Sequence, residues 1–388
     1  MQIIKVLVCD ANFSTLPVVA ALQERGYYVA CCGSIATDPC HSLADQSFIV
    51  DYSDKRALKE LVLSFNPDYL VSGCNDVSYL SASWVAEALG YSGFDSYETT
   101  QIIHEKYKFR ALCKDKNYPS PQYVTSFEQA GMLNFPVLFK PTSSFSGKGI
   151  ECYQTIEELT AAMTEHTDSG SFVIEEFVEG ALFSHSAFIK DGDILVDFFV
   201  NEYCTVYPYQ VNSSHLASDI SPEVITKARD WLKNFCKDLA LVDGLVHTQF
   251  LSDGQSFSIL EVCRRCPGDL YSLLIQKSTD VNYAWLFAAG FTKNMPDKVI
   301  GSVLPRYITR HTVSIDYHCV FLGSRLNLDC INYVNFQLKK CGEQLKAAPY
   351  DKAGIYFIEH KDNEKMHRLT EGMRDCVDIE SIAVRKSV

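Results

Sequence analysis

Residues 135–149 read Phe-Pro-Val-Leu-Phe-Lys-Pro-Thr-Ser-Ser-Phe-Ser-Gly-Lys-Gly, and they weigh most in assigning a fold. The apolar run up to Lys140 is typical of a strand, and mostly small residues follow it. A strand that ends in lysine places an ammonium group beside a loop whose backbone N–H groups can come close to phosphate oxygens. The spacing is not that of a Walker loop. Taken alone, the stretch fits a serine- and glycine-rich surface turn equally well.

A second stretch, residues 172–180, reads Phe-Val-Ile-Glu-Glu-Phe-Val-Glu-Gly. An apolar strand that ends in two acids and an aromatic residue can present backbone donors and acceptors to a flat base. By itself the same pattern favours an ordinary edge strand with solvated glutamates.

Residues 244–265 contain two apolar strands that meet at an Asp-Gly pair, which is typical of a hairpin. We expect Gln249 and Glu261 to lie near each other across this hairpin, where both can offer oxygen to Mg²⁺. Arg265 lies two pleats beyond Glu261 on the same face and could meet a phosphate bidentately. Charged residues at the end of so apolar a strand favour a functional role for Glu261 and Arg265.

Before these stretches, the first hundred residues alternate between strand and helix patterns, which predicts a parallel sheet covered by helices. The strands are expected at 3–9, 27–32, 48–51 and 69–72, and the helices at 16–25, 55–65 and 80–89. The loops at 10–15 and 73–77 would line a crevice at the carboxyl ends of the strands. No G-x-G-x-x-G motif occurs there, so a dinucleotide site is not favoured.

The pattern changes from about residue 99. Helices are expected through 104–108 (stopped by the prolines in 118–121), at 156–164, at 222–239 and at 365–376. Strands are expected at 136–140, 172–178, 183–200, 303–309, 313–321 and 355–360, besides the hairpin. We therefore expect domains at 1–98, 99–178, 179–300 and 301–388.

Composition narrows the class of protein. With 388 residues, 47% hydrophobic and 21% charged, the chain predicts a folded protein of several subdomains. The net charge of −13 disfavours a nucleic-acid or anionic-membrane partner. The start of the chain has no long apolar leader, so the fifteen cysteines are expected as free thiols in the cytoplasm. The apolar stretch 283–291 is too short to span a bilayer.

Taken in order, the three stretches resemble the ATP-grasp superfamily over roughly residues 1–300. The resemblance implies an α/β and α+β fold, in which an N-terminal parallel βαβ domain precedes a two-subdomain ATP-grasp unit and a C-terminal strand-rich subdomain. It also implies that two lysines contact ATP, that the small-residue loop covers its phosphates and that residues 175–178 hold adenine. The implied nucleotide site is Lys106, Lys140, Ser143, Ser144, Ser146, Gly147, Gly149, Glu175, Phe177 and Val178.

The resemblance also implies the metal and catalytic residues. Glu261 would bind Mg²⁺ with Gln249, and Arg265 and Lys148 would hold the reacting phosphate. His247 would steer substrate or take a proton, although a histidine in a strand is more often structural.

Three positions depart from the family's usual pattern. Gln249 stands where an acid is common, Cys263 where asparagine is usual, and Leu182 where an acid often contacts ribose. Glu261 would then bind metal almost alone, and a group such as Glu179 would contact ribose. The spacing of Cys263 and Cys266 also fits a zinc pair, but no second pair accompanies it.

The function that the resemblance implies is ATP-dependent ligation of a carboxylate to an amine through an acyl phosphate. Its partners would be ATP, a small carboxylate and an amine of the amino-acid or amino-sugar type, with a homodimer as the default assembly. Arg306 and Arg310 would recognise a substrate carboxylate. The alternatives are another ATP-grasp phosphotransferase or carboxylase, and a non-catalytic ATP-binding protein.

Overall fold

The structure, a computed structural model, describes residues 3–141, 147–166, 172–301 and 306–383. Within these ranges the strands form a small parallel sheet near the N-terminus and three further sheets in which every pairing is antiparallel. This mixture confirms the predicted fold class.

The N-terminal sheet has the strand order β3-β2-β1-β4, and its strands are parallel. Its strands are β1 (Lys5–Cys9), β2 (Tyr28–Gly33), β3 (Gln46–Ile49) and β4 (Tyr69–Ser72), and its helices are α1 (Leu16–Gln23), α2 (Cys40–Leu43), α3 (Lys55–Phe65) and α4 (Asp76–Leu89), with the 3₁₀ turn η1 (Phe13–Thr15). The four predicted strands are confirmed. Helix α4 begins one turn earlier than expected, because Asn75 caps it by accepting a hydrogen bond from the backbone N–H of Ser78.

The helix expected through 104–108 is wrong as a single helix. Helix α5 (Tyr97–His104) ends at His104, and α6 (Lys106–Lys116) begins two residues later. Glu105 between them is extended, with φ −94° and ψ 114°. The break turns α6, with Lys106 at its first position, in a new direction.

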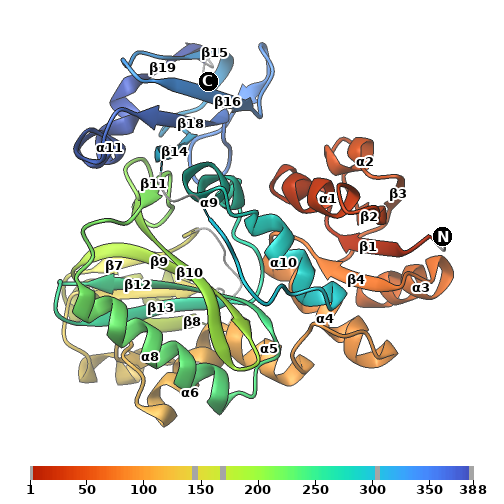
Figure 1. The fold of residues 1–388 in the computed structure, drawn as a ribbon. Coiled ribbons are helices and arrows are strands. Elements are labelled where there is room, and N and C mark those ends of the chain that lie inside the picture. The colour runs from red at the N-terminus through yellow and green to blue at the C-terminus, as the bar shows by residue number, and fades with distance from the viewer. Residues whose placement is uncertain (1–2, 142–146, 167–171, 302–305, 384–388) are drawn as a thin grey trace.

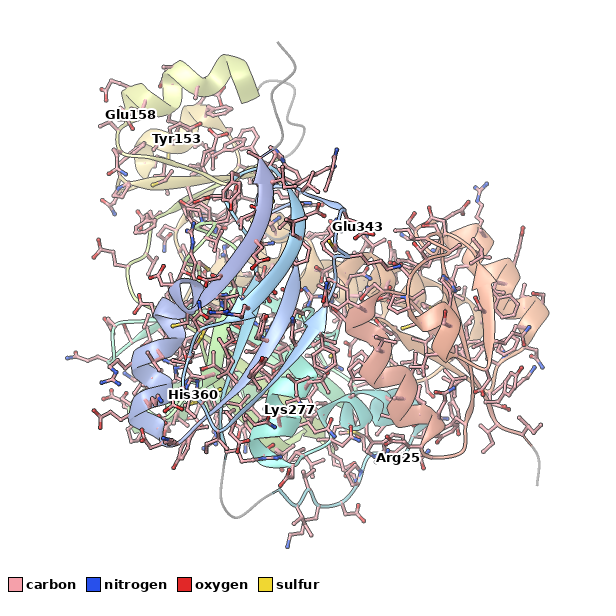
Figure 2. The ribbon with its side chains drawn as sticks, turned by 90° about the horizontal axis from the view of Figure 1, so that it is seen from above. Arg25, Tyr153, Glu158, Lys277, Glu343 and His360 are labelled. Carbon is pink, nitrogen blue, oxygen red and sulfur yellow. The ribbon has the colours of Figure 1, made fainter. Side chains whose placement is uncertain are left out.

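The small subdomain is a four-stranded antiparallel sheet in the order β5-β8-β6-β7. Its elements are β5 (Tyr123–Val124), η2 (Phe127–Met132), β6 (Val137–Pro141), β7 (Glu151–Tyr153), α7 (Ile156–His166) and β8 (Phe172–Glu176). Seen from above, the part that carries Tyr153 and Glu158 lies at a corner away from the N-terminal domain, where Arg25 is labelled (Figure 2).

The large sheet has eight strands in the order β13-β12-β9-β10-β11-β14-β18-β16. They are β9 (Ala181–Lys190), β10 (Asp193–Tyr203), β11 (Ser213–Leu216), β12 (Gly244–Ser252), β13 (Phe257–Cys263), β14 (Tyr307–Val313), β16 (Asn332–Gln337) and β18 (Gly354–His360), and helix α8 (Pro222–Asp238) precedes β12. The predicted hairpin of β12 and β13 is confirmed. The strands after residue 300 continue the sheet that β9 begins, so the domain boundary expected at 300 falls inside one sheet.

A three-stranded sheet in the order β17-β15-β19 completes the C-terminal part. Its strands are β15 (Cys319–Leu326), β17 (Gln344–Leu345) and β19 (Val377–Ala383). Helix α11 (Asn363–Thr370) and the 3₁₀ turn η3 (Glu371–Cys376) come directly before β19. The strand expected at 313–321 is wrong, because β14 ends at Val313 and β15 begins at Cys319 in a different sheet. The strand expected at 303–309 begins at Tyr307, and residues 302–305 lie outside the described ranges.

Two helices that the sequence did not predict, α9 (Tyr271–Thr279) and α10 (Tyr283–Thr292), join the N-terminal domain to the large sheet. Helix α10 contacts α1, β4 and β12, and in Figure 1 it lies between the N-terminal domain and the large sheet. One apolar core therefore runs from β1 through α10 to β9. This core packs the N-terminal domain against the large sheet.

Candidate active site

Polar side chains line one face of the large sheet. Gln249 on β12 is the register partner of Glu261 on β13 and of Ser184 on β9. Because residues directly opposite each other in a ladder share a face, these three side chains lie side by side across three strands. The sequence predicted the pair Gln249 and Glu261, and the register confirms that they face each other.

Glu202 on β10 belongs to the same group, and the sequence analysis missed it. Its carboxylate, on a residue only 5% exposed, accepts a hydrogen bond of 2.5 Å from Nε2 of Gln249. Burial raises the pKa of Glu202, and the charge of Glu261 raises it further, against the opposing effect of Arg310. An acid near the end of an apolar strand was the signal that singled out Glu261, and it applies equally to Glu202.

His247 lies two residues from Gln249 on β12 and is the register partner of Ser186 and Cys263. Its Nδ1 hydrogen-bonds with the hydroxyl of Ser186 at 2.7 Å, and that hydroxyl accepts a hydrogen bond of 3.0 Å from Tyr283. Burial, with Arg265 nearby, lowers the pKa of His247 to about 3. The imidazole is therefore neutral at pH 7 and a weak base, which favours the steering of substrate over proton transfer, the two roles expected of it.

The lysine near the end of β6 forms an ion pair with Glu175, and Glu175 also pairs with Arg110. Nζ of Lys140 lies 2.6 Å from one carboxylate oxygen of Glu175 on β8, and Nε of Arg110 on α6 lies 2.8 Å from the other. The side chains of Glu175 and Arg110 are each only 2% exposed. Burial by itself would raise the pKa of Glu175, but the two cations outweigh it and lower the pKa to about 2.

This arrangement gives Glu175 a role beside the adenine contact expected of it. Both of its carboxylate oxygens accept hydrogen bonds from Arg110 or Lys140, so its side chain anchors these two cations. Arg110, which the sequence analysis did not identify, also donates to the carbonyl groups of Ile259 and Leu260. It thereby ties β8 to β13, the strand that carries Glu261.

The backbone after β8 is the remaining part of the expected hinge. The N–H of Phe177 donates to the carbonyl of Pro136 at 2.9 Å, which anchors the backbone just after β8. Val178 follows directly and is half-buried.

Lys106, at the start of α6, donates to the carbonyl of Pro141 at 3.1 Å, next to Lys140. Burial lowers the pKa of Lys106, Glu261 opposes that effect, and the positive charge of Lys140 adds to it. Lys106 therefore lies close enough to Lys140 and Glu261 for their charges to act on it. The two predicted lysines and the predicted metal-binding acid form one charged group.

Arg265 lies in the loop after β13, not on the strand as expected, because β13 ends at Cys263. Its guanidinium makes two hydrogen bonds, of 2.9 and 3.2 Å, with the carboxylate of Asp76 at the start of α4. His104 lies 3.0 Å from the same carboxylate, and Arg265 and His104 together hold the pKa of Asp76 below its usual range despite burial. The sequence analysis missed this contact, because Asp76 and Arg265 are far apart along the chain.

The small-residue loop is described only from Gly147 onward, so Ser143, Ser144 and Ser146 lie outside the described residues. Gly147 has φ +72°, and a Cβ there would meet the backbone of Tyr209 at 2.4 Å. Tyr207 donates a hydrogen bond of 3.2 Å to its carbonyl. Lys148 lies 5.0 Å from the centre of the Tyr350 ring, and Gly149 has φ +70°. The β10–β11 turn and the C-terminal part thus support this end of the loop.

Glu261 and Gln249 fit a hard cation, because a carboxylate and an amide oxygen are ligands of that class. Cys263 does not, since burial raises the pKa of its thiol to about 12 and keeps it protonated. Among the described residues, no group of three His, Cys, Asp or Glu side chains could hold a metal by itself. Mg²⁺ commonly completes its shell with substrate phosphates, and the site offers it the right protein ligands for that mode.

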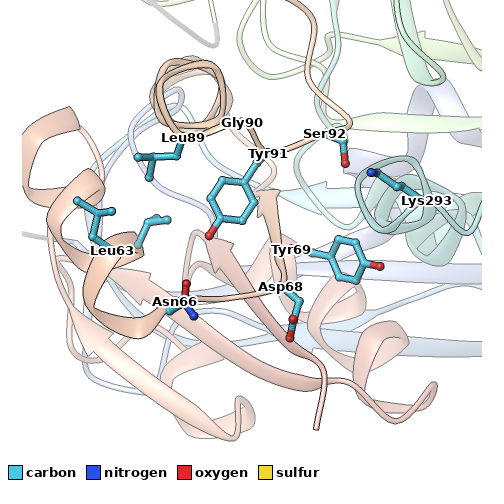
Figure 3. A pocket seen from close by; sticks show the side chains of 10 residues that line it. Leu63, Asn66, Asp68, Tyr69, Leu89, Gly90, Tyr91, Ser92 and Lys293 are labelled. Carbon is cyan, nitrogen blue, oxygen red and sulfur yellow. The ribbon is translucent and has the colours of Figure 1, made fainter. Parts of the chain in front are cut away.

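A separate groove of about 320 Å³ lies among residues that include Asn66, Asp68, Tyr69, Tyr91 and Lys293 (Figure 3). Tyr69 begins β4, so the groove lies at the amino ends of the N-terminal strands. Ligands of open α/β sheets bind at the opposite, carboxyl ends. The groove is therefore not part of the candidate site.

In the described part of the chain, no helix combines the length and apolar character needed to cross a membrane. All fifteen cysteines are free thiols.

Comparison with solved structures establishes the fold. The chain is similar to phosphoribosylglycinamide synthetase from Anaerococcus prevotii, with a TM-score of 0.78, 18% identity, and coverage of 98% of this chain and 100% of that one. It is also similar to L-amino acid ligase from Bacillus licheniformis, with a TM-score of 0.79, 15% identity and 98% coverage of both chains. Such neighbours are ATP-grasp ligases. The chain has the ATP-grasp fold.

Sequence relatives agree with the ATP-grasp fold over part of the chain. The formate-dependent phosphoribosylglycinamide formyltransferase of Prochlorococcus marinus (strain MIT 9301) is 30% identical over 152 residues, which are 36% of this chain and 39% of that protein. The enzyme of the same name from Sulfurovum sp. (strain NBC37-1) is 24% identical over 243 residues, 58% of each. The chain thus matches less than two thirds of the length of these relatives. No family model matches it.

Proposed function

We propose that this ATP-grasp protein is an ATP-dependent ligase that joins a small carboxylate to an amine through an acyl phosphate. The observation that carries the proposal is the charged group formed by Lys106, Lys140 and Glu261, with Arg265 held nearby by Asp76. Two lysine cations close to a metal-binding acid can neutralise the charge of a triphosphate while its terminal phosphoryl group is transferred.

In the proposed reaction, a carboxylate oxygen attacks the γ-phosphorus of ATP, and the bond to the β,γ-bridging oxygen breaks to release ADP. The amine then attacks the acyl carbon, the C–O bond to phosphate breaks, and the amine proton leaves with phosphate or solvent. Mg²⁺ on Glu261 and Gln249 would neutralise phosphate charge when bound. Lys140 and Lys106 would hold the phosphates, and Arg265 would stabilise the transferring group through the N–H groups that Asp76 leaves open.

The fixed pair of Glu175 and Lys140 contributes to this scheme by pre-organisation. Lys140 is held at 2.6 Å before ATP binds, so little side-chain entropy remains to be lost. The expected phosphate-covering loop, residues 143–149, would then exclude water that otherwise hydrolyses the acyl phosphate.

Arg310 on β14 supports a carboxylate substrate. It is only 4% exposed, donates to Ser214 at 2.9 Å and to the carbonyl of Asp269 at 3.2 Å, and acts on the pKa of Glu202. It therefore belongs to the polar face of the large sheet. Arg306 instead pairs with Asp280 at the surface and is about half exposed, which does not favour a role in substrate binding.

The named relatives suggest which substrates to try first. Formate is the carboxylate in the name of the formyltransferases, and amino acids are the substrates in the name of the Bacillus ligase. We propose a small carboxylate of this range, an amine of the amino-acid or amino-sugar type, and a cytoplasmic location. A homodimer is the assembly to test first.

The test is ADP release from Mg-ATP over a panel of carboxylates that includes formate and amino acids, each with and without amines. A ligase requires both partners for full ADP release. Release without an amine would indicate a phosphotransferase, and release that needs bicarbonate would indicate a carboxylase. ATP binding with background ADP release across the panel would indicate a non-catalytic protein and overturn the proposal.

A further inference from the structure

The residue opposite Glu261 is an amide, and a second carboxylate lies behind it. Gln249 faces Glu261 across the β12–β13 hairpin, and its Nε2 donates a 2.5 Å hydrogen bond to Glu202. Glu202 is on β10, which is separated from β12 by β9. The carboxylate that position 249 lacks is therefore present one hydrogen bond away.

This hydrogen bond determines how the amide is oriented. Nε2 of Gln249 donates to Oε2 of Glu202, so the NH₂ group of the amide is turned toward Glu202. The carbonyl oxygen Oε1 is then the atom of Gln249 that remains for a cation beside Glu261. An amide turned the other way would present N–H groups to the cation and repel it.

The surroundings of Glu202 fit this role. The residue is only 5% exposed, and Val200, two residues before it on β10, is the register partner of Ser184, so Glu202 lies on the same sheet face as Ser184 and Gln249. Gln249 lies between Glu202, which accepts its hydrogen bond, and Glu261, its register partner. A cation between Glu261 and Gln249 would therefore meet an amide whose orientation is fixed by Glu202.

Resting on the proposed use of Mg-ATP, we propose that Glu202 is the positioning residue of the metal site. It fixes the amide of Gln249 with the oxygen toward the cation. The pair Glu202 and Gln249 replaces one carboxylate ligand by an oriented amide and a carboxylate behind it.

The experiment measures Mn²⁺ binding in the presence of a nonhydrolysable ATP analogue, by the electron paramagnetic resonance signal of free Mn²⁺. Outer-shell partners of metal ligands commonly change metal affinity about 10- to 100-fold. We expect Glu202→Gln to weaken Mn²⁺ binding about tenfold at the least. The exchange Glu202→Gln with Gln249→Glu keeps a carboxylate–amide pair and should restore affinity to within about threefold of the native value.

Glu359→Gln serves as the control, because it is the same change on β18 of the same sheet, three strands from β10. It should leave Mn²⁺ affinity unchanged. Circular dichroism and thermal melting verify that each variant is folded. A structural role alone would lower the melting temperature without moving the Mn²⁺ affinity of the folded protein.

Two results would overturn the inference. One is native Mn²⁺ affinity in folded Glu202→Gln, and the other is an exchange variant that binds no better than the single variant. If neither native protein nor Glu261→Ala binds Mn²⁺, the proposed function is wrong, and this inference falls with it. Binding that depends on Glu261 but not on Glu202 would leave the proposed function intact and reject the role of Glu202.

Discussion

Nζ of Lys140 lies 2.6 Å from the carboxylate of Glu175, which also forms an ion pair of 2.8 Å with Arg110. Glu175 is thus a buried anion between two cations from different elements, β6 and α6. The contact links the stability of the fold to the placement of the lysine that we propose holds ATP.

Replacement of Arg110 by Met should destabilise the protein by about 3–5 kcal/mol, because it leaves the carboxylate of Glu175 buried with only Lys140 as a cationic partner. The free energy of unfolding in urea measures this. Arg306→Met is the matched control, since Arg306 pairs with Asp280 at the surface, and it should cost less than about 1 kcal/mol. Equal losses for the two variants would show that burial of the Glu175 pair is unimportant.

Stability should fall in acid through Glu175. Its pKa is about 2 in the folded protein, against an ordinary value of 4.5. A lowered folded-state pKa stabilises the protein above the unfolded pKa, and that contribution is lost as the pH falls from 4.5 toward 2. The loss attributable to Glu175 is about 3 kcal/mol. Urea unfolding at several pH values should show a flatter acid limb for Glu175→Gln than for native protein, and parallel limbs would contradict the ion pair.

Lys140→Ala should weaken ATP binding about ten- to hundredfold, because a charge-assisted contact with phosphate is worth about 1.5–3 kcal/mol. Isothermal titration calorimetry measures the affinity. Lys116→Ala, at the exposed end of α6, is the control and should bind as native protein does. Unchanged affinity in Lys140→Ala would mean that the phosphates lie elsewhere.

His247 should contribute no ionisation to the rate near neutral pH, because its pKa is about 3. His247→Asn should lower the rate of ADP release by loosening its contact with Ser186, yet keep the shape of the pH–rate profile between about pH 6 and 8. A native profile with an apparent pKa near 6.5 that disappears in His247→Asn would instead make His247 the proton acceptor.

The sequence predicted what lies within single elements or one hairpin. The N-terminal alternation, the strand that carries Lys140 and the facing of Gln249 and Glu261 all follow from local periodicity and one turn. It did not predict α9 and α10, because the nearly uniform apolar run of α10 carries no helical period.

The partners of the site residues were harder to predict. Each partner is far away along the chain. Arg110 is 65 residues from Glu175, Asp76 is 189 residues from Arg265, and Glu202 is 47 residues from Gln249. No local pattern encodes such contacts, since tertiary packing brings the elements together. Only the occurrence of charged residues in apolar surroundings could have indicated them, and for Glu202 that signal was present.

The central claim is that a carboxylate is activated by direct phosphoryl transfer from ATP. The most direct test uses the carboxylate that best stimulates ADP release, labelled with ¹⁸O, together with the amine and native enzyme. If an acyl phosphate forms, the carboxylate oxygen that attacked the γ-phosphorus stays with phosphate when the amine displaces it. Mass spectrometry should therefore find ¹⁸O in the released phosphate in proportion to product. Released phosphate without ¹⁸O, at the same rate of ADP formation, would contradict the account.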